Sequence, residues 1–85
     1  MAGTVVWQDG RALKDAYVVV YAGKSYFRRI DLGKNPKFGF VLYGDFDYSI
    51  EAGDDRGEIE GESERVKLTP ANATSLKLSL RRVAH

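Results

Sequence analysis

The sequence predicts an all-β fold, a seven-stranded and mainly antiparallel Greek-key β-sandwich, and three observations lead to this prediction. Apolar and polar residues alternate with a period of two along most of the chain, which is typical of strands with one buried face. Turn-forming residues interrupt the alternation about every 8–12 residues, as expected for short strands in an all-β domain. No segment shows a convincing helical period. With 85 residues, the chain is expected to form one domain, residues 1–85.

The first three strands are expected at residues 4–7, 16–22 and 25–30. The first strand ends before Asp9-Gly10, a dipeptide that favours the positive φ angles of a tight turn. The second strand consists mainly of β-branched and aromatic residues, which favour a strand over a helix. A turn at Gly23-Lys24 leads into the third strand, and the turn-forming residues up to Pro36 follow it.

The remaining strands are expected at residues 37–42, 46–52, 64–68 and 76–81. The alternation is clearest in residues 46–52, where the even positions are apolar and the odd positions are polar. Asp47, Ser49 and Glu51 should therefore share the solvent-facing side of this strand. The polar, glycine-spaced residues 53–62 are expected to form a loop or a loose hairpin.

One face of each strand together supplies a predicted hydrophobic core. Its members are Val5, Trp7, Ala16, Val18, Val20, Phe38, Phe40, Leu42, Tyr48, Ile50, Ala52, Val66, Leu68, Leu76, Leu78 and Leu80. A chain this short buries only about 60–65% of the surface that its unfolded form exposes, and it has no cysteine for a disulfide. Packing of this core must therefore provide most of the stability.

The composition excludes several classes of function. The chain has no cysteine and a single histidine, His85, so thiol catalysis, a histidine-based catalytic triad and a Cys/His zinc site all lack their residues. No targeting segment and no apolar run of about 18 residues is present, so we expect no membrane insertion. The formal net charge is +1, but residues 45–64 carry a net charge of −8 between two basic blocks, which disfavours nucleic acid as a partner. We predict a protein that is not an enzyme.

The pattern of the whole chain resembles the carboxypeptidase regulatory-like domains, which share a transthyretin-like (prealbumin-like), immunoglobulin-like sandwich with Cna B-type repeats. The matching pieces are Gly3-Thr4-Val5, Asp9-Gly10, Ala16-x-Val18-x-Val20-Tyr21, Phe38-x-Phe40 and Gly44-x-x-x-Tyr48-x-Ile50-x-Ala52, in the order of that family. The resemblance implies a non-catalytic module attached to a larger protein. Because one fold serves many functions, the resemblance does not define a ligand.

The resemblance also implies which strands are neighbours. It places residues 16–22 beside residues 25–30 and 46–52, and residues 64–68 beside residues 46–52. The outward acids of residues 46–52 would then face Arg65 and Lys67, so the charge blocks would form a cross-strand ladder of ion pairs.

Tyr17, Val19, Tyr21 and Tyr26 are the candidate binding residues. The first three cannot be core residues if Ala16, Val18 and Val20 are, so they should form an exposed strip with Tyr26 nearby. An exposed aromatic strip can contact a neighbouring domain or a protein partner, or bind a carbohydrate or peptide. High β-propensity by itself also explains the presence of these residues in a strand.

Asp45, Asp47, Asp54 and Asp55 are weak candidates for calcium ligands, since calcium prefers several oxygen ligands. Carboxylates along one face of a strand diverge, and no Asp-x-Asp-x-Asp-Gly loop occurs, so we predict no metal and no cofactor. We expect an accessory or scaffold module of a larger extracellular or cell-surface protein, which contacts neighbouring domains or a protein partner. The alternative is a carbohydrate- or peptide-binding module that uses the face of Tyr17, Val19 and Tyr21.

Overall fold

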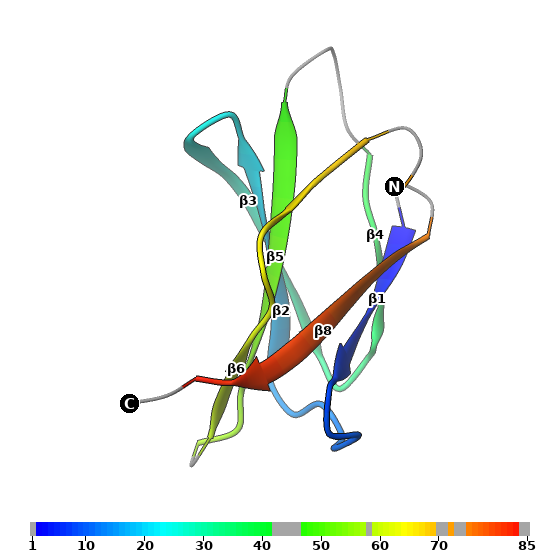
Figure 1. Cartoon of the computed structure of the whole chain (residues 1–85), viewed down its shortest axis with the longest axis vertical. Helices are drawn as coiled ribbons and strands as arrows, with labels where there is room; N and C mark the ends of the chain where they lie inside the picture. The colour runs from blue at the N-terminus through cyan, green and yellow to red at the C-terminus, as the bar shows by residue number, and fades with distance from the viewer. Residues whose placement is uncertain (1, 42–46, 58, 70–71, 73–74, 84–85) are drawn as a thin grey trace.

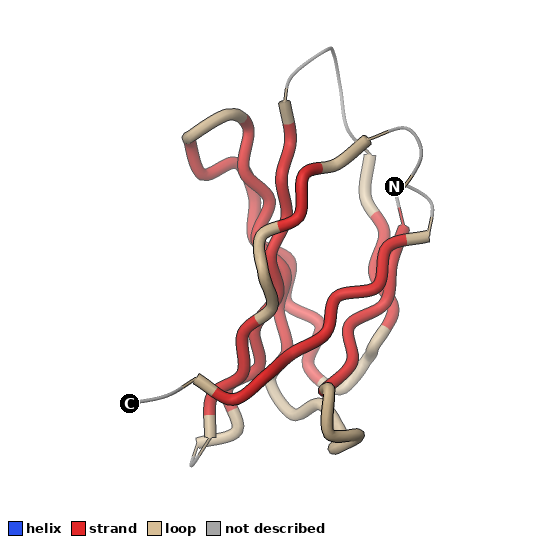
Figure 2. Tube along the Cα trace, viewed as in Figure 1, coloured by secondary structure: helices blue, strands red, loops and turns tan. Residues whose placement is uncertain are grey.

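The computed structural model of the chain describes residues 2–41, 47–57, 59–69, 72 and 75–83. These residues form strands and loops without any helix, which confirms the all-β class (Figures 1 and 2). The strands are β1 (Ala2–Trp7), β2 (Ala16–Ala22), β3 (Ser25–Gly33), β4 (Lys37–Gly39), β5 (Tyr48–Asp55), β6 (Glu60–Glu62), β7 (Val66–Lys67) and β8 (Leu76–Arg82).

The strands form one curled, mixed sheet that resembles an open half-barrel. The order across the sheet is β3-β2-β5-β6-β8-β1-β4. β5 pairs with β6 through residues 53–55 and with β7 through residues 49 and 50, on the same side. β1 and β8 are parallel to each other, whereas the other pairs are antiparallel. β6 connects the two halves, because it pairs with β5 on one side and with β8 on the other (Figure 1).

The described residues contain eight strands where the sequence predicted seven. The additional strand is β6, which lies within the stretch expected to be a loop or a loose hairpin. β5 continues to Asp55 and forms a short antiparallel hairpin with β6, which Gly57 closes with a positive φ of 85°. The two turns expected at Gly10 and Gly23 are present, and both glycines have positive φ.

The two halves of the curled sheet enclose the predicted core. Its buried residues are Val5, Trp7, Ala16, Val18, Val20, Phe38, Phe40, Tyr48, Ile50, Ala52, Leu76, Leu78 and Leu80, as predicted. Val66 and Leu68 were also predicted to be core residues but are only half-buried, since β7 is short and pairs with β5 alone. Leu42 lies outside the described residues. Leu13 from the loop after β1 is an additional member, and Asp54 is a buried acid that the prediction did not include.

Candidate functional site

The outer face of β3, β2, β5 and β7 carries the predicted binding residues. The pairings confirm the expected neighbours, because β2 lies between β3 and β5, and β7 pairs with β5. Tyr17, Val19 and Tyr21 alternate with the buried residues of β2 and are themselves half-buried. They are therefore less exposed than the sequence suggested, because side chains of the neighbouring strands cover them.

Tyr21 lies in a cluster with Glu51 and Arg65. Its hydroxyl donates a hydrogen bond to Oε1 of Glu51 at 2.5 Å, and the Arg65 guanidinium lies over its ring with Cζ 3.7 Å from the ring centre. Arg65 Nε is also 3.9 Å from Oε2 of Glu51. The hydrogen bond to Glu51 is the main cause that raises the pKa of Tyr21 above its ordinary value of 10.0, and partial burial raises this pKa further. The neutral phenol is thus part of the cluster.

Tyr17 is contacted by residues of both neighbouring strands. The Arg29 guanidinium of β3 lies over the ring, with Cζ 4.1 Å from the ring centre. Gly53 of β5 is the opposite residue of the pairing, and a Cβ atom there would overlap the Tyr17 ring. Burial raises the pKa of Tyr17 above 10.0, Arg29 acts in the opposite direction, and the charges of Glu62 and Glu60 raise it further.

Beside Tyr17, the outer face is hollowed into a pocket of about 490 Å³, which we call the acidic hollow. It lies across the ends of β2, β3, β5 and β6, and Gly33 and Gly61 are among its lining residues. Its charged lining residues are Asp15, Arg29, Asp31, Asp54, Asp55, Glu60 and Glu62. Asp15, Glu60 and Glu62 form no ion pair with any residue that the structure describes. Six acids and one base thus line the acidic hollow, so its lining carries a net negative charge.

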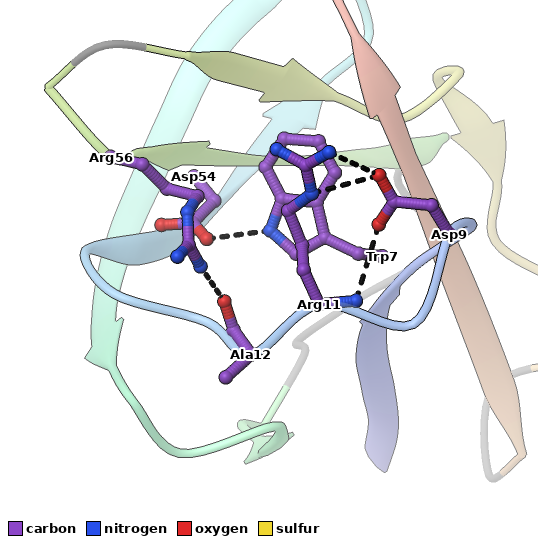
Figure 3. A network of polar contacts seen from close by, with 6 residues as sticks. All are labelled: Trp7, Asp9, Arg11, Ala12, Asp54 and Arg56. Atoms are coloured by element: carbon purple, nitrogen blue, oxygen red, sulfur yellow. Dashed lines mark hydrogen bonds and ion pairs between the residues drawn. The ribbon is translucent and has the colours of Figure 1, made fainter.

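Asp54 is the innermost carboxylate at this end of the sheet, and it is only 1% exposed. Its Oδ2 accepts a hydrogen bond from Trp7 Nε1 at 2.7 Å (Figure 3). Its Oδ1 accepts one from the backbone N–H of Asp15 at 2.8 Å. The backbone N–H of Lys14 lies 3.2 Å from Oδ2. A buried carboxylate is costly unless it is hydrogen-bonded, so these donors explain why it is tolerated.

These hydrogen bonds tie the loop between β1 and β2 to the end of β5. Nearby, Arg56 donates a hydrogen bond to the carbonyl oxygen of Ala12 (Figure 3). Arg11 Nη2 forms an ion pair with Oδ2 of Asp9 at 2.5 Å. The Cζ atom of Arg11 lies 5.0 Å from the centre of the Trp7 ring. The hydrogen bond from the Arg11 side chain is the main cause that lowers the pKa of Asp9 below 3.8. The rim of the acidic hollow is thus formed by a loop that is held in place.

The predicted charge ladder is present across β5 and its neighbour. Asp47 Oδ1 lies 3.8 Å from Lys67 Nζ, and Glu51 lies beside Arg65 as described above. Tyr26 lies at the β2–β3 turn, away from the acidic hollow, and is 64% exposed. The structure therefore brings Tyr17, Val19 and Tyr21 together on one face and places Tyr26 at its far end.

The aspartates considered for calcium do not converge. Asp47 and Asp54 lie at opposite ends of β5, about 23 Å apart at the usual rise of a strand. Asp54 points inward to Trp7, Asp55 is exposed, and Asp45 lies outside the described residues. In the part of the chain that the structure describes, no three acidic or histidine side chains are grouped so that they could hold a metal ion.

Sequence reasoning missed the role of Asp54 and the acidic hollow. A signal for Asp54 was present: the inward positions 48, 50 and 52 continue in phase to 54, so an aspartate falls on the core side of the strand. The contact of Gly61 with the Trp7 ring, where a Cβ atom would overlap, becomes apparent only in the structure. The depth of the acidic hollow depends on the β5–β6 hairpin, for which the sequence had no distinct pattern.

Comparison of the chain with protein-family models, curated proteins and solved structures gives no match. The resemblance to carboxypeptidase regulatory-like domains therefore stays a prediction that rests on the residues alone. The described residues include no helix of the length and apolar character needed to cross a membrane.

Proposed function

We propose that the protein is a non-catalytic accessory module that binds a basic segment of a protein partner or neighbouring domain in the acidic hollow. In this proposal, the two halves of the curled sheet correspond to the two layers of a prealbumin-like Greek-key sandwich, within a larger exported or surface-associated protein. The observation that carries the proposal is the acidic hollow itself, with Tyr17 held rigidly at its side. The lack of cysteine and of any histidine other than His85 supports a function without catalysis.

The charge of the acidic hollow favours a basic partner. Asp15, Glu60 and Glu62 form no ion pair with any described residue, and Arg29 is the one base among the charged residues of the lining. Arg81, the cross-strand neighbour of Glu62, lies outside the lining and pairs with Glu64. A lysine or arginine side chain of a partner would supply the missing charge, and complementary charges increase both specificity and association rate. Tyr17 would provide apolar contact area at little entropic cost, because Arg29 and Gly53 already restrict its ring.

A protein partner is favoured over a carbohydrate on β2. Sugar rings bind aromatic side chains by stacking on a free ring face, whereas a guanidinium already lies over the ring of Tyr17 and another over the ring of Tyr21. A sugar would first have to displace a guanidinium from an aromatic ring, which costs about 0.5–2 kcal/mol. The exposed ring of Tyr26 is the observation that keeps a carbohydrate-binding module as the second candidate.

Amide chemical shifts of the isotope-labelled chain at about 0.15 M salt test the proposal, since this ionic strength screens non-specific attraction. The ligands are lysine- and arginine-rich peptides, acidic peptides of equal length, and a set of glycans. We expect the basic peptides to shift Tyr17, Gly53 and Glu62, which lie in one row across the sheet. The double variant Glu60→Gln/Glu62→Gln should weaken these shifts, whereas Lys77→Gln on β8 should not.

Equal shifts with acidic and basic peptides, or no localised shifts with either, would contradict the proposal. Shifts that glycans alone produce around Tyr26 would favour the second candidate instead.

A further inference from the structure

β3 is the longer of the two edges of the curled sheet. It has nine residues, and in the described part of the chain it pairs with β2 alone. The other edge strand, β4, has three residues. An unpaired edge presents backbone N–H and C=O groups that can pair with another strand. β3 is therefore the edge with enough length to add a further strand.

The hydrogen bonds of β5 show in which direction the backbone groups of this half-sheet point. The carbonyls of Tyr48 and Ala52 accept hydrogen bonds from Leu68 and Ser63, on the side of β5 away from β2. Because the direction alternates from residue to residue, Glu51 and the other odd residues of β5 direct their backbone groups toward β2.

The same alternation continues through β2 to β3. The odd residues of β2 pair with the odd residues of β5, so Val18 and its even neighbours direct their groups toward β3. Val18 is opposite Ile30, and the register is continuous over residues 28–31 of β3. Ile30 thus bonds to β2, while Arg29 and Asp31 direct their backbone N–H and C=O groups to the free edge.

We propose that two copies of the chain associate through β3, antiparallel about a two-fold axis at Ile30, so that Arg29 of each copy lies opposite Asp31 of the other. This register forms backbone hydrogen bonds at both Arg29–Asp31 pairs, since these are the residues whose groups point outward. The two Ile30 side chains then face each other on the core side, where Ile30 is half-buried and packs against the hydrophobic core.

Charge complementarity selects a second copy as the occupant and also selects the register. A shift of the axis to Arg29 would place two arginines opposite each other, and a shift to Asp31 would place two aspartates opposite each other. Like charges directly across an antiparallel pair are unfavourable, whereas opposite charges are favourable. Within one copy Arg29 Nε and Asp31 Oδ1 are 3.0 Å apart, and both side chains are more than half exposed. In the dimer, each of the two side chains can therefore replace this ion pair within one copy by an ion pair to the other copy.

Sedimentation velocity and light scattering over roughly 10 µM to 1 mM test the association, because an interface made by one strand pair is small and belongs to the weak class. We expect the dimer fraction to rise across this range. Arg29→Asp or Asp31→Arg should each weaken dimerisation about tenfold or more, because each places like charges opposite each other. The double variant Arg29→Asp/Asp31→Arg restores opposite charges in both pairs and should restore the dimer.

The absence of cysteine from the sequence allows a direct test of the register. In Ile30→Cys the two cysteines would face each other across the axis with Cα atoms about 4.5 Å apart, within the range of a disulfide. In the control Arg28→Cys the two residues would be offset by four positions, about 13 Å. Mild oxidation should therefore produce a covalent dimer of Ile30→Cys and much less of Arg28→Cys.

A chain that stays monomeric at 1 mM overturns the proposal. So does a dimer that the single charge reversals leave intact, or equal crosslinking of the two cysteine variants. Circular dichroism of each variant shows whether it is folded, and the restoring double variant separates loss of the interface from loss of the fold.

Discussion

Two acidic residues, Asp54 near the end of β5 and Asp47 directly before its start, are used in opposite ways. Asp54 points inward, is 1% exposed and accepts hydrogen bonds from Trp7 and from two backbone N–H groups. Asp47 points outward, and its ion pair with Lys67 is at 3.8 Å between side chains that are 82% and 71% exposed. The same chemical group is thus a part of the core on one face and a surface charge on the other, and burial makes the difference.

Replacement of Asp54 should produce the largest effect. Asp54→Ala leaves the indole N–H of Trp7 and the backbone N–H groups of Lys14 and Asp15 without their acceptor, so we expect the free energy of unfolding to fall by about 2–4 kcal/mol. Denaturant unfolding followed by Trp7 fluorescence measures this loss. In the control Glu62→Ala, which removes an exposed acid, the change should stay within about 0.5 kcal/mol. Equal losses in the two variants would show that Asp54 does not stabilise the loop.

Gly61, which lies against Trp7 in the core, and Gly53, which lies against Tyr17 on the outer face, allow the tightness of packing on the two faces of the sheet to be compared. A Cβ atom at Gly61 overlaps the buried ring of Trp7, so Gly61→Ala overpacks the core and should cost about 1–3 kcal/mol. A Cβ atom at Gly53 overlaps Tyr17, which is half-buried and therefore less enclosed than Trp7, so Gly53→Ala should cost less. Thermal unfolding of the two variants compares them, and a larger loss for Gly53→Ala would reverse this ranking of the two faces.

The ion pairs of the outer face should contribute little to stability. Asp47→Asn or Lys67→Gln should change the free energy of unfolding by less than about 1 kcal/mol, since exposed pairs are weakened by solvent and salt. The double variant in a mutant cycle should show a coupling that decreases further between low salt and about 1 M salt. A coupling as large as the loss from Asp54→Ala would mean that the ladder, rather than the core, holds β5 and β7 together.

The smallest expected effect is a change in the alkaline titration. The folded state raises the pKa of Tyr21 and Tyr17 above 10.0, so the stability linked to these phenols is fully present below pH 10 and is lost as the pH rises through the folded pKa values. Phenolate absorbance should show tyrosines that titrate later in the folded than in the unfolded chain. Tyr21→Phe should remove one late-titrating group, and Glu51→Gln should shift Tyr21 back toward 10.0. An unchanged titration in Glu51→Gln would contradict the hydrogen bond as the cause.

Much of the fold was predictable because alternation is a local property. The even residues of β2 and β5, and Leu76, Leu78 and Leu80 of β8, are buried as the period of two predicted. Two neighbours of β5, β2 and β7, were also predicted, although that prediction came from a resemblance between patterns and not from the alternation. Its third neighbour, β6, was not predicted. The candidate binding residues on β2 were located correctly on the outer face, but the alternation could not reveal that Arg29, Arg65 and Gly53 cover their rings.

The sequence by itself determined the approximate positions of all the described strands except β6, the turns at Gly10 and Gly23, and the buried side of the longer strands. These features follow from side-chain periodicity and from backbone preferences within a few residues. Only the tertiary structure decided that β1 and β8, from opposite ends of the chain, pair in parallel, and that Asp54 meets donors 39 and 47 residues away. Such pairings depend on how the whole sheet curls around its core. The acidic hollow and the free edge of β3 arise at the same level, because each is formed by strands that are brought together only in the folded chain.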